Sequence, residues 1–449
     1  MKPTIATAFT QCAAFARSTV ALAAPLLLAA AIAKAAAPPE KPSAETSPAE
    51  AGQPATADAG GSTLTNNWFG AGDRLAEQGL TLKLSASQVY QDMAHGGVFT
   101  HSHAGRYSGR YDFEILGDVE KLAGVKGGSF YILTEGGWSR GIENVAVSNL
   151  FNPNAVPLGT TAGHIVEFRY DQSLCNDRLR IRVGKIDLTG TFESADIPGA
   201  FDANAFANDE TSQFLNSALV NNPTIPFPQR GLGAVVSMKL TDSWYVSAGV
   251  GDASARDGLT GFSTAFDGSH ETLSLYETGY IAALPSANGP LHGAYRVGMW
   301  YDTVPRDRFD GEGDCRNNTG LYVSIDQVLL KEKDDPKDAE GLGAFARFGF
   351  ADAAVNAVKF FWSAGGQYRG LLPGRDADVL ALGVAQGRLS NAPGAGFTAP
   401  SETAVETYYS IEVTPWLHLA PSIQYIFSPG GLREARDALI VGVRIQAAF

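Results

Sequence analysis

The chain of 449 residues carries a formal net charge of −13. An acidic chain repels other polyanions, which excludes nucleic acid as a partner. Its 50 glycines and its aromatic content of 10% indicate a protein of many turns and strands rather than of helices.

The first residues, 1–37, have the pattern of a secretory signal. Lys2 and Arg17 give this segment a basic start, and an apolar run follows at 20–33. The run is too short for a membrane helix and Pro25 interrupts it, and no later window reaches the roughly 18 apolar residues that such a helix needs. Loss of the signal removes three basic residues, so the net charge falls from −13 to about −16. We therefore expect an exported chain, which can sit in a membrane only as a β-barrel.

Residues 38–63 are rich in Pro, Ala, Glu and Thr and have no periodic apolar face, so we expect a disordered leader. The remainder, 64–449, opens with a short amphipathic helical turn at 68–79 and continues as strands joined by turns rich in Gly, Asn, Asp and Pro. The sequence predicts about sixteen strands, at 79–91, 105–117, 128–137, 163–172, 178–187, 232–241, 243–252, 271–284, 292–303, 318–332, 341–352, 357–370, 376–386, 404–414, 417–428 and 437–449.

The predicted strands alternate between an apolar face and a polar face, with the period of two of a β-strand. In the second strand, Tyr107 and Phe113 share one face, and Arg110 and Glu114 share the other. The last strand has the same pattern and ends on the aromatic Phe449 without a polar tail. Such an ending is typical of an outer-membrane barrel, whose last strand pairs with its first.

Two architectures explain this alternation: a soluble β-sandwich, whose apolar faces meet in a core, and a transmembrane barrel, whose apolar face meets lipid. Tyr and Phe gathered at strand ends favour lipid, because aromatic girdles mark the membrane interfaces. The longest connection, at 188–231, follows the fifth strand, and at this place sixteen-stranded porins fold a loop into the barrel. We predict an all-β fold, a transmembrane antiparallel barrel of about 16 strands with an inward-folded constriction loop. Within that loop we expect a short helix to begin at 209–216.

No motif in the chain indicates catalysis. His95, His101 and His103 follow the first strand, but no Cys accompanies them in a metal-ligand spacing. A Gly-rich phosphate loop and a nucleophile elbow are also missing from the sequence. We therefore expect no enzyme activity, no metal and no cofactor. Cys175 and Cys315 fall at opposite ends of the predicted barrel, so we expect no disulfide between them.

Short motifs that follow one another along 64–449 resemble the carbohydrate-selective porins of the OprB type. The motifs are Asn67-Trp68-Phe69-Gly70 with Asp73-Arg74-Leu75 and Gly79, Tyr90-Gln91-Asp92 with Gly96-Gly97, Arg182-Val183-Gly184-Lys185-Ile186-Asp187 with Phe192, Asn222-Pro223-Thr224 with Pro226, Pro228 and Gly231-Leu232-Gly233-Ala234, Tyr295-Arg296-Val297-Gly298-Met299-Trp300-Tyr301, Gly320-Leu321-Tyr322 with Asp326-Gln327, Gly370-Leu371 with Pro373-Gly374-Arg375-Asp376, Glu406-Thr407-Tyr408-Tyr409, and Pro421-Ser422-Ile423-Gln424-Tyr425-Ile426 with Pro429-Gly430-Gly431. The resemblance implies a sixteen-stranded barrel in the outer membrane of a Gram-negative cell. It also implies passive diffusion of glucose-like sugars through a narrowed, water-filled pore.

A sugar is neutral and rich in hydroxyl groups, and its rings have apolar faces. A site that passes a sugar needs bidentate hydrogen-bonding groups and an aromatic ring on which the apolar face of the sugar can stack. It must also bind the sugar weakly enough to release it. The predicted inner face offers both. We predict these pore-lining substrate contacts: Arg106, Arg110, Glu114, Glu167, Arg169, Asp171, Arg182, Lys185 and Asp187 as polar groups, and Trp138, Phe192 and Trp300 as aromatic groups. The alternative for the charged residues is ion pairing that stiffens the barrel, and for the aromatic residues a girdle or packing role.

The alternatives to a sugar-selective channel are a general or cation-biased porin, an outer-membrane enzyme or adhesin on a barrel, and a secreted β-protein that binds glycans. The partners that follow are mono- or oligosaccharides, outer-membrane lipid, and the barrel-assembly machinery, which would read the strand ending at Phe449. A homo-oligomer is a further expectation. The sequence leaves open which sugar passes and what the connections at 137–163 and 388–403 do.

Overall fold

The computed structural model describes residues 63–97, 105–142, 149–189, 200–226, 230–255, 271–335 and 338–449. All of these ranges belong to one compact unit, Ala49–Phe449. Within them, no helix has the length and the apolar character needed to cross a membrane. The predicted signal and almost all of the predicted leader lie outside the described residues.

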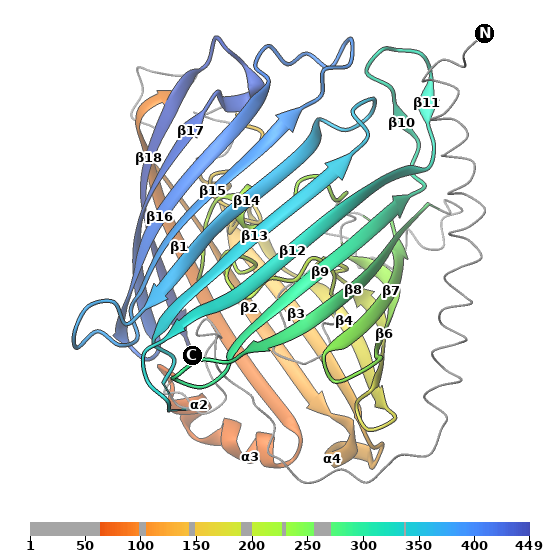
Figure 1. Ribbon diagram of the computed structural model, residues 1–449. Helices are drawn as coiled ribbons and strands as arrows, with labels where there is room; N and C mark the ends of the chain where they lie inside the picture. Colours follow the sequence, from red (N-terminus) through yellow and green to blue (C-terminus); the bar gives the residue numbers. More distant parts are fainter. Residues whose placement is uncertain are drawn as a thin grey trace. The chain divides into compact units, whose positions relative to one another are not determined.

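The fold is a closed barrel of antiparallel strands (Figure 1). Its sixteen strands are β1 (Leu80–Gly97), β2 (Arg106–Asp118), β3 (Gly128–Trp138), β4 (Thr161–Leu174), β5 (Leu179–Ile186), β6 (Gly231–Lys239), β7 (Trp244–Asp252), β8 (Thr272–Leu284), β9 (Leu291–Asp302), β12 (Asn318–Lys331), β13 (Gly341–Ala351), β14 (Val358–Arg369), β15 (Val379–Leu389), β16 (Ser401–Thr414), β17 (Leu417–Phe427) and β18 (Arg436–Ala448). Each strand pairs with its neighbours in sequence, and β1 closes the ring by pairing with β18. Closure leaves no unpaired edge, which is what a sheet needs in order to satisfy its backbone in lipid. The predicted fold class is confirmed.

Side chains alternate between the inside and the outside of the barrel, as predicted. In β9, Arg296 and Trp300 point inward and are 2% and 0% exposed, whereas Val297 between them is 56% exposed. The alternation is interrupted at Val166. A bulge between β3 and β4 inserts this residue as an extra one, so Val166 is 3% exposed and Ile165, at 49%, takes the outward place. Such a bulge shifts the register by one residue and exchanges the faces beyond it.

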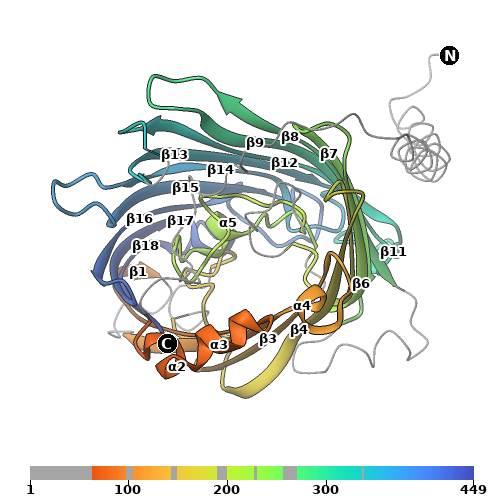
Figure 2. The ribbon, with the colours of Figure 1, turned by 90° about the horizontal axis from the view of Figure 1, so that it is seen from below.

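The two ends of the barrel differ. The strands end in short turns at the rim where the described chain begins and ends (Figures 1 and 2), and the longer connections lie at the opposite end. Because outer-membrane barrels have short periplasmic turns and longer extracellular loops, the rim with both termini is the periplasmic one. The short elements that do not belong to the barrel sheet are α2 (Asn66–Phe69), α3 (Ala71–Glu77), α4 (Val119–Ala123), α5 (Ser217–Val220), β10 (Arg306–Asp307), β11 (Asp314–Cys315) and η2 (Pro429–Gly431).

Within the described residues, Cys175 and Cys315 are not joined by a disulfide. Cys175 lies in the turn after β4 at the periplasmic rim, and Cys315 lies in β11 in the extracellular connection between β9 and β12. The height of the barrel separates them, in agreement with the predicted order of the strands.

We expect Val297→Arg to lower the free energy of unfolding by about 2–4 kcal/mol, because it places a cation on the lipid face near the bilayer midplane. The measurement is unfolding by guanidinium of the barrel in phospholipid vesicles, followed by the gel shift of the folded form. The matched control is Ser85→Arg, on the inner face of β1 next but one to Lys83, which we expect to change stability little. Equal stability of both variants would mean that the outer face does not meet lipid.

Candidate functional site

The connection between β5 and β6, residues 187–230, folds into the barrel and is called the constriction loop below. Figure 2 shows its helix α5 inside the ring of strands. In the part of the loop that the structure describes, Phe201, Asn204 and Phe214 are completely buried. The prediction that this connection folds inward is confirmed.

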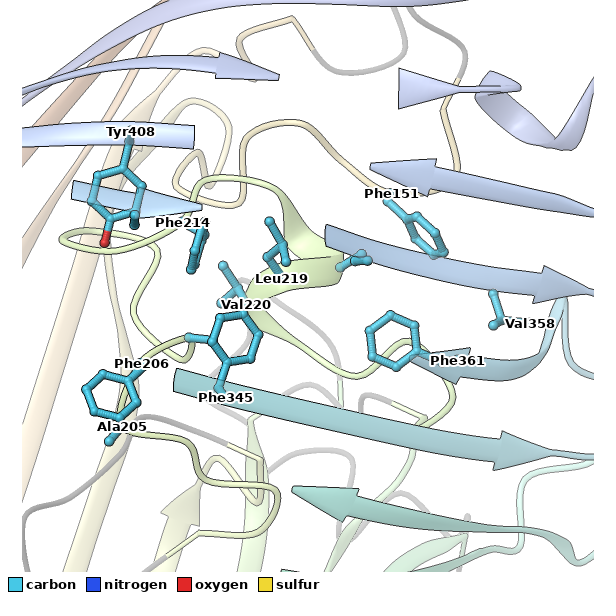
Figure 3. Close-up of a cluster of buried hydrophobic side chains, with 14 of the residues drawn as sticks. Phe151, Ala205, Phe206, Phe214, Leu219, Val220, Phe345, Val358, Phe361 and Tyr408 are labelled. Carbon is cyan, nitrogen blue, oxygen red and sulfur yellow. The ribbon is translucent and has the colours of Figure 1, made fainter. Parts of the chain in front are cut away.

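Apolar side chains attach the constriction loop to the wall at β13–β16. Phe214 of the loop lies edge-on to Phe345 and to Tyr408, with ring centroids 5.7 and 5.3 Å apart (Figure 3). Phe206 and Leu219 belong to the same buried cluster. Burying one such side chain completely stabilises a fold by about 1.5–3 kcal/mol, so several of them hold the loop firmly on this side of the barrel.

Buried acidic side chains supply acceptors for the loop backbone. An irregular loop inside a barrel leaves N–H and C=O groups without partners, and leaving them unsatisfied is costly. Glu406 of β16, which is 0% exposed, accepts hydrogen bonds from the backbone N–H groups of Leu215 and Asn216, both at 2.8 Å. One carboxylate therefore takes two adjacent donors of the loop.

Buried arginines supply the matching donors. Arg347 of β13, also 0% exposed, donates to the carbonyl groups of Leu219 and Val220 at 3.1 and 2.8 Å. Arg444 of β18 donates to the carbonyl of Gln213 at 2.8 Å. Strands far apart in the sequence thus position one loop.

The predicted helix start at 209–216 is wrong, because the helix begins at Ser217, directly after this stretch. The side chain of Asp209 accepts hydrogen bonds from the backbone N–H groups of Thr211 and Ser212, which forms a turn instead of a helix. The helix is α5, and its N-cap is Asn216, whose side chain accepts from the N–H of Ala218. Asp209 satisfies the local donors itself, so its acidic first-turn signal does not begin a helix.

The connection after β3 also folds inward, and its residues 149–156 are called the companion segment below. Glu402 of β16, which is 0% exposed, accepts from the backbone N–H groups of Leu150 and Phe151, both at 2.8 Å. Gln424 of β17 donates to the carbonyl of Pro153 at 2.7 Å. The sequence analysis left the role of this connection open, and the structure places it inside the barrel.

The companion segment and the constriction loop are joined by two backbone hydrogen bonds. The N–H of Ala155 donates to the carbonyl of Leu215, and the N–H of Ser217 donates to the carbonyl of Asn152, both at 2.8 Å. The constriction loop and the companion segment are therefore bonded to each other inside the barrel.

A repeated sequence pattern marks the two loops. In Asn152-Pro153-Asn154 the first side chain accepts from the N–H of Asn154 at 3.0 Å, and in Asn222-Pro223-Thr224 the first side chain accepts from the N–H of Thr224 at 3.1 Å. Each pattern is an Asx turn that reverses the chain. Only the second copy is among the motifs that resemble the porin family. The first copy is a signal in the sequence that the companion segment also turns back.

On the opposite side, ion pairs connect the constriction loop to β2, β3 and β5. Arg110 of β2 pairs with Glu210 of the loop at 2.6 Å. At the end of the loop, Arg230 pairs with Glu135 of β3 at 2.8 Å and with Asp187, directly after β5, at 3.0 Å. The middle of the loop and its last residue are thereby tied to this wall by charge.

A second group of charges lies on β4 and β5. Arg169 pairs with Glu167 at 2.6 Å and with Asp171 at 3.3 Å, and Arg182 also pairs with Asp171 at 2.7 Å. The guanidinium of Arg169 lies over the ring of Tyr131, 4.2 Å from its centroid, in a cation–π contact. The neighbouring groups thus hold Arg169 in one orientation.

These inward-facing ions form what we call the charge ladder. Its members are Arg110, Asp112, Glu135, Glu167, Arg169, Asp171, Arg182, Lys185, Asp187, Glu210 and Arg230. Several of them are partly exposed: 12% for the side chain of Arg169, 19% for Glu210 and 26% for Arg230. Because they point into the barrel, this exposure is toward its interior. Glu406 and Arg347 on the other wall are covered by the loop.

Most of the predicted polar contacts lie on this inner face. Arg110, Glu167, Arg169, Asp171, Arg182, Lys185 and Asp187 belong to the charge ladder, and Glu114 accepts from the hydroxyl of Tyr131 at 3.2 Å. Lys185 is buried and donates to the carbonyl of Ile165 at 2.6 Å. Arg106 lies apart, exposed at the extracellular end of β2, where it donates to the carbonyl of Gly105.

Of the predicted aromatic contacts that the structure describes, neither Trp138 nor Trp300 offers a ring face to a sugar in the pore. Trp138 is 38% exposed and packs over Gly109, which alternates with the inward Arg110 and so lies on the outer face; its prediction as a pore residue is wrong. Trp300 is 0% exposed in a cluster between the wall and the constriction loop, so it packs and does not face the pore. Phe192 lies outside the described residues, as do His101 and His103.

Sequence reasoning missed several inward residues: Tyr131, Glu135, Glu210, Arg230, Arg347, Glu402, Glu406 and Arg444. Period-two alternation places the strand members of this group on the inner face. No sequence signal distinguishes those that hold a loop from those that meet water, because that depends on where the loop lies.

A closed antiparallel barrel with an apolar outside, a charged inside that meets water and loops folded into it is the architecture of a porin, a diffusion pore of the outer membrane. Residues 102–449 match the model of the family described as "Carbohydrate-selective porin, OprB family". The chain belongs to this family and is an outer-membrane porin.

Relatives agree with this assignment. Porin B of Pseudomonas aeruginosa is 25% identical over 427 residues, which cover 86% of this chain and 91% of that protein. The high pH structure of Pseudomonas putida OprB superposes with a TM-score of 0.74 at 23% identity, covering 87% of this chain and 99% of that one. The low pH structure of the same protein gives a TM-score of 0.53 at 17% identity. These structures establish the likeness of the fold.

We expect Glu406→Gln to loosen the constriction loop. The glutamine has a single acceptor oxygen for the two backbone N–H groups of Leu215 and Asn216, and its NH₂ group would face one of these donors. Leaving a buried group unsatisfied costs about 1–3 kcal/mol. Single-channel recording should then give a larger and noisier conductance. The control is Glu412→Gln, in the same strand, where the backbone N–H rather than the carboxylate makes the hydrogen bond to Asp378. An unchanged conductance in the Glu406 variant would show that this carboxylate does not position the loop.

Proposed function

We propose that this porin passes neutral sugars of glucose size by passive diffusion, and that the charge ladder with Tyr131 is the selective surface. The observation that carries the proposal is the balance of the ladder. It contains five cations and six carboxylates, most of which form ion pairs with one another, and several members are partly exposed toward the interior of the barrel. A surface of this kind offers many hydrogen bonds and little net field, which suits a neutral polyol better than an ion.

The geometry of Arg169 supports a weak sugar site. Glu167, Asp171 and Tyr131 fix its guanidinium, so its N–H groups are oriented before a sugar arrives. Sugar hydroxyl groups would exchange with water on these groups as the molecule passes. The contacts are weak because each charge already has a partner, and a weak contact permits release.

The family and the name of the relative Porin B both describe channels, and this supports diffusion over catalysis. The runner-up is a general or cation-biased porin. The observation that favours it is the acidity of the chain, whose formal net charge is −13. A measured reversal potential in a salt gradient distinguishes a cation-biased pore from a neutral one.

We further propose how the chain is processed and divided. Residues 1–37 act as a secretory signal that is removed, 38–63 form a leader, and 64–449 form the barrel. The apolar alternation of β18 and the terminal Phe449 suit recognition by the barrel-assembly machinery. A homo-oligomer is testable by cross-linking in membranes.

The test is single-channel conductance in a planar bilayer, with glucose titrated into the bath. We expect saturable block of the wild-type pore. Arg169→Ala should weaken the apparent affinity for glucose about tenfold, because a hydrogen bond to a charged group contributes about 1.5–3 kcal/mol.

The control is Arg178→Ala. Arg178 pairs with Asp242 in exposed periplasmic turns, where the two side chains are 56% and 97% exposed. We expect glucose to block this variant like the wild type. Stable conductance that no sugar blocks would indicate a general porin instead of a sugar-selective one. Equal block in both arginine variants would remove Arg169 from the selective surface.

A further inference from the structure

The segment before β1 carries an apolar side chain that neither the barrel nor the pore uses. Phe69 of α2 is 85% exposed, the highest value among the large hydrophobic residues that the structure describes, and Leu64 is 48% exposed. Large exposed apolar groups that lie together mark contact with an apolar partner.

The backbone around Phe69 is unusual. All four residues of Asn66–Phe69 are in the left-handed region, with φ between 51° and 58°. Asn tolerates this conformation, but Trp and Phe rarely adopt it. Two hydroxyl groups hold the turn: the N–H of Asn67 donates to Oγ1 of Thr63 at 2.7 Å, and the N–H of Trp68 donates to Oγ1 of Thr65 at 3.0 Å. A costly conformation that is held in this way is typical of a functional segment.

The turn lies on the outer side of the wall at the periplasmic rim. Trp68 packs edge-on against Phe113, with ring centroids 6.3 Å apart, and its Nε1–H donates to the carbonyl of Leu82 at 3.4 Å. Phe113 alternates with inward residues of β2 and therefore faces outward. The N–H of Leu64 donates to the carbonyl of Ala448, which places the segment beside the seam of β1 and β18 (Figure 2).

We propose that the left-handed turn, residues 66–70, is a membrane-interface anchor that inserts Phe69 and Trp68 between the phospholipid headgroups and acyl chains of the periplasmic leaflet. Contact of Trp68 with Phe113 makes the turn continuous with the lipid-facing surface of the barrel. Trp is enriched at this depth of membranes, because its ring is apolar and its N–H is polar. Asp73 and Glu77 of α3 are exposed, which suits a helix that stays in water beyond the anchor.

The experiment places a fluorescent probe at Phe69. In a background of Cys12→Ser, Cys175→Ser and Cys315→Ser, Phe69→Cys is labelled with bimane, and the chain is reconstituted into phosphatidylethanolamine and phosphatidylglycerol vesicles. Quenching by a lipid with a nitroxide at carbon 5 of its acyl chain is compared with quenching by iodide in water. The gel shift on heating confirms that each labelled barrel is folded.

The matched control is Glu77→Cys, one short helix away. We expect the nitroxide lipid to quench the probe at position 69 at least twofold more than iodide does, and the reverse at position 77. Leu64→Cys provides a second site, which should behave like position 69. Strong quenching by iodide at both 64 and 69 would overturn the proposal, because the turn would then lie in water. Protection from both quenchers would also overturn it, because protein rather than lipid would cover the turn.

Discussion

The constraint on which the structure depends is that a loop inside a barrel has no sheet to complete its backbone hydrogen bonds. The wall meets this need with buried charges. Glu406 accepts hydrogen bonds from two N–H groups of the constriction loop, while Arg347 and Arg444 donate hydrogen bonds to its carbonyl groups. Charged acceptors and donors make stronger hydrogen bonds than neutral ones, and this offsets the cost of burying them. The position of the constriction loop, and with it the size of the opening, therefore rests on a few side chains of β13, β16 and β18.

The two loops in the lumen depend on each other. Glu402 and Glu406 stand four residues apart on β16, so they point to the same face; one holds the companion segment and the other holds the constriction loop. Backbone hydrogen bonds then join the loops. The two loops therefore share their support on the wall and are bonded directly to each other.

The barrel interior divides its charges between two tasks. On the side of β13–β18 the ions are fully buried and serve to hold the loops. On the side of β2–β5 they are paired with one another and partly exposed, as Arg169 and Arg230 are. In the proposed function this second group forms the selective surface. Position and selectivity would then be supplied by different residues with the same chemistry.

The sequence by itself determined the barrel. Period-two alternation and the order of turns specify which residues face lipid, because a strand has only two faces and only closure satisfies its edges in a membrane. Most of the polar residues predicted for the pore lie on the inner face for this reason. Only the tertiary structure decided what each inner residue does. Trp300 is covered by the loop, Trp138 lies outside, and the bulge at Val166 changes the register locally. The hydrogen bonds that position the constriction loop join residues more than 100 positions apart, and no local pattern records them.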